Sequence, residues 1–241
     1  MFKFINDLSQ KLLGPRKERV ISKLSSVLSL VSVAGFAIAG LALWLFAEIT
    51  EEVLAKETES FDTAILQTLA SFHTPLLNKI MIGVTFLGEP KFLVWLSLAF
   101  GLLLLLQKRW GSFITTTIAA TGAISLNFWL KNMFSRDRPE LWERIIDVSF
   151  YSFPSGHAMI SLVIYGFVGY WFASSFKSWR IPIISFTTLL IAAIGISRLY
   201  LGVHWPTDVI AGYAAGLVWL ISCILGLEVA RKYSEGTGNR E

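Results

Sequence analysis

Six long apolar segments constrain the fold of this chain more than any other feature of its sequence. They cover residues 28–49, 92–106, 111–129, 158–176, 181–196 and 209–229. A bilayer core of about 30 Å requires roughly 20 apolar residues in helical form, and a spanning segment must be helical because hydrocarbon offers the backbone no hydrogen-bond partners. Only 16% of the residues are charged, whereas a water-soluble domain has about a quarter. The sequence therefore predicts an all-α, integral membrane bundle of six transmembrane helices.

The distribution of basic residues predicts how this bundle is oriented. Lysine and arginine are in excess in the short flanks on the cytoplasmic side of membrane proteins. Here they concentrate before the first span, between spans two and three, between spans four and five, and after the last span. We therefore expect both termini to be cytoplasmic. Residues 1–26 would form a basic N-terminal segment, residues 27–232 a six-span domain, and residues 233–241 an irregular cytoplasmic tail.

The segment between the first two spans, residues 50–91, has a weak helical periodicity of its own. Apolar residues recur at positions 61, 65, 66, 69 and 72, and again at 76, 77 and 80. Proline interrupts a helix or begins a new one. We predict a short interfacial helical segment here, formed by one or two helices and broken at Pro75.

Several cations lie on the side of the membrane where the charge rule does not expect them. They are Lys131, Arg136, Arg138, Arg144 and Arg198. Ionisable groups at this depth are costly and usually functional, so we expect a negatively charged ligand beside most of them. Arg136 is the exception: its acidic neighbours in the sequence favour a solvent-exposed loop of ion pairs, with a supporting contact to the phosphate site as the alternative.

Three clusters of reactive or charged residues fall at the outer ends of spans three to six. They are Lys131-x6-Arg138-Pro139, Pro154-Ser155-Gly156-His157 and Ser197-Arg198-x5-His204-x3-Asp208. In the predicted topology all three reach one depth on one side of the membrane. The sequence therefore predicts a single site built from three separate stretches of chain.

The cations and the Ser-Gly pair of these clusters suit a phosphate group. Lys131, Arg138 and Arg198 supply positive charge, and the arginines add paired donors that match phosphate oxygens. Ser155 and Gly156 begin a helix, whose unpaired N–H groups and positive end favour an anion.

The two histidines suit the transfer of that phosphate. Asp208 lies four residues beyond His204 and can reach back along one helical face. A carboxylate bonded to one imidazole nitrogen raises the basicity of the other, which makes His204 a candidate nucleophile. His157 could protonate the leaving group and then activate water.

The clusters resemble the signature of the type 2 phosphatidic acid phosphatase superfamily, K-x6-RP, PSGH and SR-x5-H-x3-D. All eleven specified residues are present in order and at the right spacing. The resemblance implies hydrolysis of lipid phosphates or pyrophosphates at the outer membrane face, through a phosphohistidine and without a metal or other cofactor. It implies that His204 is the nucleophile, Asp208 its orienting partner and His157 the acid and base. The residues it implies for phosphate binding are Lys131, Arg138, Ser155, Gly156 and Arg198.

Other functions remain open on the sequence alone. The site could belong to a lipid phosphotransferase with an acceptor other than water, or to a non-catalytic phospholipid-binding or transport protein. Related haloperoxidases hold vanadate in a similar clamp, but they are soluble. We expect a lipid phosphate and the membrane as partners and no nucleic acid, since the basic N-terminal residues adjoin the membrane. The lipid is open between phosphatidic acid, phosphatidylglycerol phosphate and undecaprenyl pyrophosphate, with the last two favoured by the resemblance; the oligomeric state is open too.

A few other conspicuous residues have structural interpretations. Gly212 and Gly216 form a G-x3-G pair, which favours close helix packing within the bundle. His73 has no partner nearby in the sequence, so we expect a structural role. Aromatic residues before the fourth span, Phe150 and Phe153 among them, either line the mouth of the site or pack at the interface.

Overall fold

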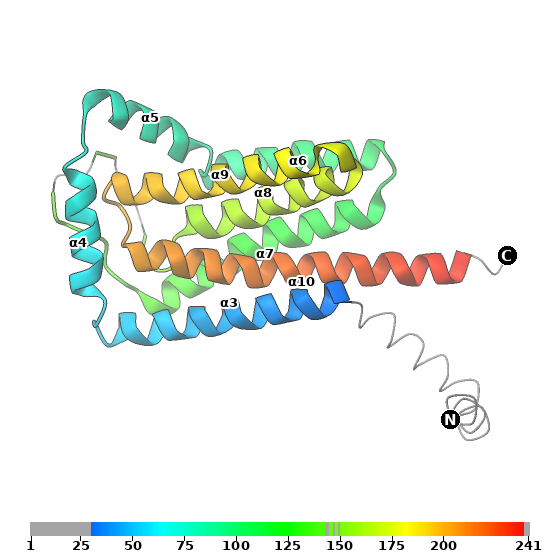
Figure 1. Ribbon diagram of the computed structural model, residues 1–241, viewed down its shortest axis with the longest axis horizontal. Coiled ribbons are helices and arrows are strands. Elements are labelled where there is room, and N and C mark those ends of the chain that lie inside the picture. Colours follow the sequence, from blue (N-terminus) through cyan, green and yellow to red (C-terminus); the bar gives the residue numbers. More distant parts are fainter. Residues whose placement is uncertain (1–29, 143–144, 147, 149, 239–241) are drawn as a thin grey trace, which may run out of the picture. The chain divides into compact units, whose positions relative to one another are not determined.

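The computed structural model describes residues 30–142, 145–146, 148 and 150–238, and in this part of the chain all regular structure is helical. The chain divides into two compact units, Met1–Ile38 and Ala39–Glu241, and every candidate site residue belongs to the second. The predicted N-terminal segment 1–26 lies outside the described residues. The helices, shown in Figure 1, are α3 (Leu30–Leu54), α4 (Glu59–Ala70), α5 (Pro75–Phe86), α6 (Pro90–Leu106), α7 (Trp110–Phe134), α8 (Gly156–Ser175), the 3₁₀ turn η1 (Lys177–Trp179), α9 (Arg180–Tyr200) and α10 (Pro206–Gly238).

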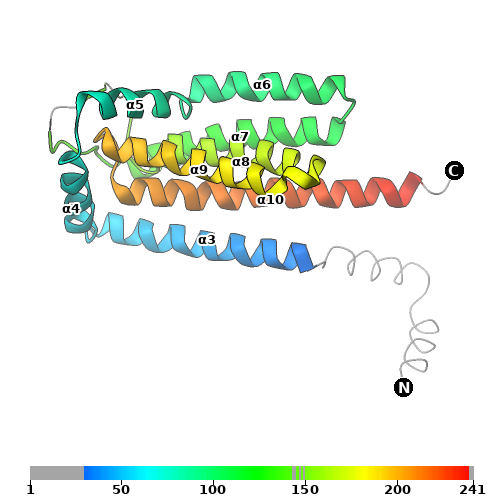
Figure 2. The same ribbon diagram turned by 45° about the horizontal axis from the view of Figure 1, so that its top comes forward.

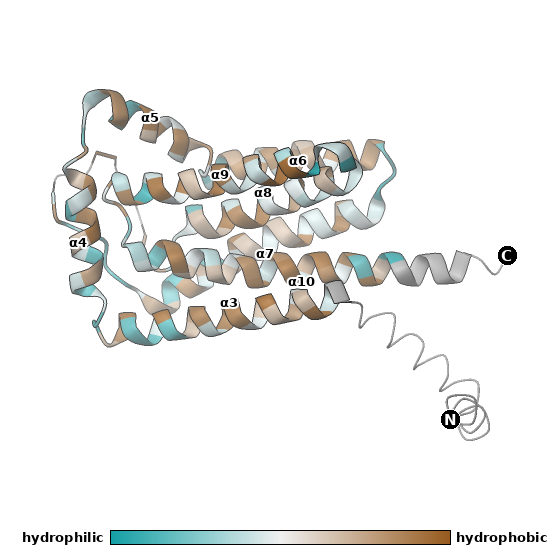
Figure 3. Cartoon of the chain, in the orientation of Figure 1, coloured by the Kyte–Doolittle hydropathy of each residue, from teal (hydrophilic) through white to brown (hydrophobic). Residues whose placement is uncertain are grey.

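Five stretches of helix are long and apolar enough to cross a membrane. They are Ser32–Leu54, Trp110–Phe134, Gly156–Ser175, Lys177–Tyr200 and Pro206–Arg231. The remaining predicted span lies in α6, which has only 17 residues and qualifies together with α5, from which it is bent by 46°. The predicted all-α transmembrane bundle is thus confirmed, with five spans, or six if the bent pair is counted as one. Figure 3 shows hydrophobic residues along the long helices and hydrophilic residues gathered near their ends.

The segment between the first two predicted spans forms two helices, α4 and α5. They are separated by residues 71–74, and Pro75 is at the first position of α5. Thr74 caps α5, because its side-chain oxygen accepts a hydrogen bond from the backbone N–H of Leu77 at 3.2 Å. Both views of the ribbon show α4 crossing the end of the bundle at a steep angle to α10 (Figures 1 and 2).

The last helix, α10, is longer than predicted. It continues to Gly238, so the expectation of an irregular tail from residue 233 is wrong for residues 233–238. Once a helix is formed, each further residue adds a hydrogen bond at little cost, and no proline follows Pro206 to stop it.

α8 forms the centre of the bundle and packs against α6, α7, α9 and α10. Two glycines of α10 set its distance from α8. A Cβ atom on Gly212 would lie 2.7 Å from the carbonyl oxygen of Ser155, and one on Gly216 would lie 2.9 Å from that of Met159. The G-x3-G pair therefore packs within the bundle and brings the first turns of α8 and α10 together.

Candidate functional site

The three motif clusters meet at one end of the bundle. Consecutive helices from α7 to α10 run antiparallel, so α7 and α9 end where α8 and α10 begin (Figures 1 and 2). Lys131 and Arg198 lie in the last turns of α7 and α9. His157 and Asp208 lie in the first turns of α8 and α10. His204 lies in the short connection between α9 and α10.

The His204 ring is held by Asp208 through one of its nitrogens. Nδ1 of His204 lies 3.2 Å from Oδ2 of Asp208, and both side chains are almost completely buried. When Nδ1–H donates to the carboxylate, Nε2 carries the lone pair. Nη1 of Arg138 lies 3.4 Å from Nε2. The nitrogen that carries the lone pair is therefore the one that faces Arg138.

Asp208 is itself held by groups on both of its oxygens. Oδ2 accepts hydrogen bonds from the hydroxyl of Ser152 and from the backbone N–H of Trp205, the latter at 2.9 Å. Oδ1 accepts from Nη1 of Arg136 at 2.7 Å. These bonds fix the direction of the carboxylate and, through it, the plane of the His204 ring.

Arg136 bridges two buried carboxylates, of which Asp208 is one. Its Nη2 lies 2.8 Å from Oδ2 of Asp62 in α4. Asp62 also accepts the backbone N–H of Thr207 at 3.0 Å and the Thr207 hydroxyl at 2.7 Å. The prediction that Arg136 belongs to a solvent-exposed loop is therefore wrong. Its side chain is only 15% exposed, because two carboxylates compensate the burial of its charge.

Lys131 and Arg138 face the site and also bind backbone carbonyls in the segments before α8 and α10. Nζ of Lys131 donates hydrogen bonds to the carbonyl oxygens of Tyr151 and Ser152. Nη1 of Arg138 donates to the carbonyl oxygen of Val203 at 2.6 Å. The two cations thus tie together the segments that precede α8 and α10.

Two buried nitrogens of the site have no hydrogen-bond partner among the residues that the structure describes. They are Nε of Arg198 and Nε2 of His157. Nη1 of Arg198 donates to the hydroxyl of Thr85 at 2.8 Å. Nε2 of His157 is 3.4 Å from a carboxylate oxygen of Glu89, which is long for a hydrogen bond. Buried polar atoms are almost always paired, so these two nitrogens indicate a place for a polar ligand.

Ser155 and Gly156 have structural contacts of their own. The backbone N–H of Ser155 donates to the carbonyl oxygen of Asp208 at 2.9 Å, and its side chain caps α8. A Cβ atom on Gly156 would lie 2.8 Å from Oδ1 of Asn127. A side chain at this position would therefore displace the Asn127 side chain, and the role of both residues in phosphate binding stays a prediction.

The surroundings of His204 favour its uncharged form. Burial lowers the pKa of His204 well below its ordinary value, and the nearby cations, Lys131 above all, lower it further. The site therefore favours the neutral ring, which has a lone pair on one of its nitrogens. The charges of Arg138, Arg198 and His157 act in the same direction, so they too lie near this ring.

Several residues of the site were not identified from the sequence, and Arg136 was predicted to lie in an exposed loop. The unidentified residues are Asp62, Thr85, Glu89, Ser152 and Thr207. Asp62 left a signal, because it lies four residues before Leu66 on one face of α4, and both are completely buried. A carboxylate on the apolar face of an amphipathic helix is expected to have a buried partner. Nothing local distinguishes Thr85 or Glu89, which reach the site through the bend between α5 and α6.

The remaining sequence interpretations have mixed outcomes. Nε2 of His73 lies 2.8 Å from the carbonyl oxygen of Tyr200, in keeping with a structural role. Phe150 is 74% exposed, whereas Phe153 is completely buried against Phe46, so Phe153 does not line the mouth of the site. Among the described residues no three metal-ligating side chains come together; independence of metals stays a prediction.

Comparison with known proteins agrees with this geometry. The model of the PAP2 superfamily matches residues 109–231. Phosphatidylglycerophosphatase B of Bacillus subtilis is 33% identical over 73% of this chain and 89% of its own length. Undecaprenyl-diphosphatase of Sulfolobus acidocaldarius is 29% identical over 73% of this chain and 84% of its own. A crystal structure of a transmembrane PAP2-type phosphatidylglycerolphosphate phosphatase from B. subtilis superposes with a TM-score of 0.72 and 27% identity, over 77% of this chain and 94% of that one.

The family match covers about half of the chain and includes all three motif clusters, and the B. subtilis relative extends the similarity to nearly three quarters of it. Both the predicted family and the predicted lipid phosphatase activity are thereby confirmed, and the apolar helices make the protein a multi-pass membrane protein. The chain belongs to the PAP2 superfamily.

Proposed function

We propose that this protein hydrolyses lipid phosphate or pyrophosphate monoesters through a phosphohistidine on His204, at the extracytoplasmic face of the membrane. The observation that carries the proposal is the His204 ring, bonded to Asp208 through Nδ1 with Nε2 directed toward Arg138. A neutral imidazole aimed into a group of cations is the arrangement expected of a nucleophile that attacks a phosphate.

In the first step the phosphate is held by Lys131, Arg138 and Arg198, and Nε2 of His204 attacks phosphorus in line with the leaving oxygen. The P–N bond forms as the P–O bond to the lipid breaks. His157 gives a proton to the leaving oxygen, and Asp208 stabilises the positive charge that develops on His204. The cations act mainly by stabilising negative charge on the phosphoryl oxygens in the transition state.

In the second step water completes the reaction. His157, now unprotonated, takes a proton from a water molecule as that water attacks phosphorus. The P–N bond breaks, inorganic phosphate leaves, and His204 returns to its neutral form. His157 ends this step protonated, as the next cycle requires, and Glu89 lies 3.4 Å from it.

The proposed orientation has support from the end of the bundle opposite the site. The connections there carry Lys108 and Arg109 between α6 and α7, and Lys177 and Arg180 between α8 and α9. Under the positive-inside rule this is the cytoplasmic end, which leaves the site extracytoplasmic and both termini inside. A cysteine-labelling reagent that cannot cross membranes should react with a cysteine placed at Glu140 and not with one placed at Lys108. The opposite labelling pattern would mean that the proposed orientation is wrong.

The mechanism is tested by phosphate release from the detergent-purified protein with excess chelator. We expect His204→Ala to lose release by at least a thousandfold, while His73→Gln, a change in a histidine outside the site, keeps it. His157→Ala should also lose release, because the leaving oxygen no longer receives a proton in the first step and water is no longer activated in the second. Near-normal release by His204→Ala would exclude the nucleophile assignment. Lipid binding without release by the wild type would favour a binding protein or a phosphotransferase.

The substrate we propose is phosphatidylglycerol phosphate or undecaprenyl pyrophosphate. The names of the two curated relatives point to these two lipids, and an extracytoplasmic site fits both. A panel that also contains phosphatidic acid, compared by kcat/KM, would rank the three. Equal rates on all three lipids would argue against any selection by the lipid tail.

A further inference from the structure

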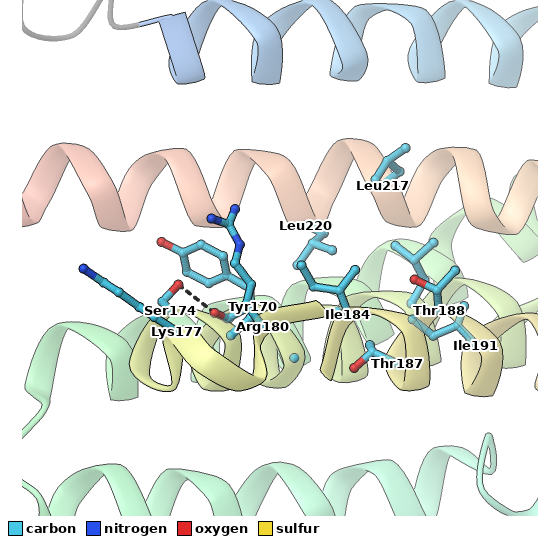
Figure 4. A pocket seen from close by; sticks show the side chains of 14 residues that line it. Tyr170, Ser174, Lys177, Arg180, Ile184, Thr187, Thr188, Ile191, Leu217 and Leu220 are labelled. Atoms are coloured by element: carbon cyan, nitrogen blue, oxygen red, sulfur yellow. Dashed lines mark hydrogen bonds between the residues drawn. The ribbon is translucent and has the colours of Figure 1, made fainter. Parts of the chain in front are cut away.

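A groove of about 550 Å³ lies between α8, α9 and α10, away from the catalytic site. Its floor is α8, with Gly166 and Gly169, and its walls include Ile184 of α9 and Leu220 of α10. Figure 4 shows these side chains turned toward the space between α9 and α10. The groove has the size of a small-molecule site and is lined mainly by apolar side chains.

One end of the groove carries positive charge. Lys177 and Arg180 line it there and both are exposed; Figure 4 shows the Arg180 side chain extending toward α10. Neither forms an ion pair with a carboxylate in the part of the chain that the structure describes. The acid on the adjoining turn of α10, Glu228, is paired with Arg231 at 3.0 Å and accepts the hydroxyl of Tyr170. The charge at this end is therefore not neutralised by Glu228.

This charged end is far from the catalytic residues. Arg180 and Arg198 are eighteen residues apart on one helix, which at 1.5 Å per residue corresponds to about 27 Å. That distance is close to the thickness of the bilayer core. An occupant of the groove would thus come from the leaflet opposite the one that serves the catalytic site.

We propose that this groove binds one anionic phospholipid. Its phosphate would lie between Lys177 and Arg180, and an acyl chain would run along Ile184 and Leu220. Basic pockets between transmembrane helices are suited to anionic headgroups, and an apolar space between spans, open to hydrocarbon, is suited to an acyl chain. Trp179, 65% exposed between the two cations, is the kind of residue that sits at headgroup level. The bound lipid would join α9 to α10, the helices whose other ends carry Arg198 and Asp208.

The test is native mass spectrometry of the detergent-purified protein titrated with phosphatidylglycerol or with phosphatidylcholine of the same chains. Phosphatidylglycerol is a phosphodiester, so a phosphomonoesterase site does not consume it. We expect the wild type to bind one phosphatidylglycerol in preference to phosphatidylcholine. The double variant Lys177→Gln/Arg180→Gln should lose that preference by on the order of tenfold. Ile184→Trp, which fills the apolar part, should weaken the binding of both lipids.

The matched control is Lys108→Gln/Arg109→Gln, which removes two exposed cations from the same end of the bundle but not from the groove. It should bind phosphatidylglycerol like the wild type, and so should Arg198→Gln, which alters only the catalytic end. Equal binding of the two lipids by the wild type would overturn the proposal. So would loss of the preference in Arg198→Gln with retention in Lys177→Gln/Arg180→Gln, which would place the lipid at the catalytic site. A dimer without bound lipid would also overturn it, in favour of a second copy covering the groove.

Discussion

Replacing Asp62 by asparagine tests whether α4, which lies outside all three motifs, helps to position the carboxylate of Asp208. Asp62 is completely buried and shares Arg136 with Asp208, at 2.8 and 2.7 Å. The amide has nearly the same shape, and one oxygen can still accept the Thr207 N–H. It has no charge, however, and its NH2 group would face either the guanidinium or Thr207.

The expected size of the effect of Asp62→Asn on kcat follows from the hydrogen bonds that are lost. A hydrogen bond to a charged group contributes about 1.5–3 kcal/mol, and about 2 kcal/mol corresponds to roughly thirtyfold in a rate constant. Arg136 would be fixed on one side only, so Asp208 and the His204 ring would be less well oriented. We expect kcat to fall by about ten- to thirtyfold with KM little changed. Thermal stability should fall as well, because a buried cation loses one of its two anions.

A double-mutant cycle separates this positioning role from a general loss of stability. If Asp62 acts through Asp208, then Asp62→Asn should cost little in an Asp208→Asn background, because the group it positions is already disabled. The control is Glu59→Gln, an exposed acid in the same first turn of α4, which should behave like the wild type. Wild-type kcat in a folded Asp62→Asn protein, or fully additive losses in the cycle, would refute the reasoning.

Three further predictions concern acid stability, metals and packing. Burial lowers the pKa of His204, so its contribution to the free energy of unfolding is complete above the unfolded pKa of about 6.5 and is lost below it, by about 1.4 kcal/mol per pH unit. His204→Gln should therefore lose less thermal stability than the wild type between neutral pH and about 5.5. Equal losses in the two proteins would contradict this prediction. Excess chelator should leave phosphate release unchanged, whereas inactivation that Mg²⁺ reverses would show a metal requirement. Gly212→Ala should destabilise the protein by about 1–3 kcal/mol, because the new Cβ would meet the backbone of Ser155 at 2.7 Å; Gly226→Ala in the same helix, with nothing within 4 Å, is the control, and equal melting temperatures would contradict the prediction.

Much of this protein could be predicted from the sequence because the relevant signals are local. A run of apolar residues predicts a span whatever its neighbours are, since the bilayer itself requires the helix. The motif residues keep fixed spacings at the ends of spans, so the topology alone brings Lys131, His157 and Asp208 to one end. The pairing of His204 with Asp208 is also local, because His204 lies in the short connection just before α10 and Asp208 lies in the first turn of that helix.

The groups that surround the His204–Asp208 pair could not be predicted from the sequence and depend on how the helices pack. Asp62 and Arg136 are 74 residues apart in the chain, and no sequence pattern indicates that they pair with each other. Their pairing depends on α4 crossing the end of the bundle, and this follows from packing rather than from any local pattern. Glu89 and Thr85 reach His157 and Arg198 because α5 and α6 bend by 46° at their junction, where a Cβ atom on Gly88 would lie 2.4 Å from Ile194. The spans, the motif set and the His204–Asp208 pair could be predicted from the sequence. The buried charges that hold this pair in place could not, because the partners of a buried charge depend on which helices become neighbours.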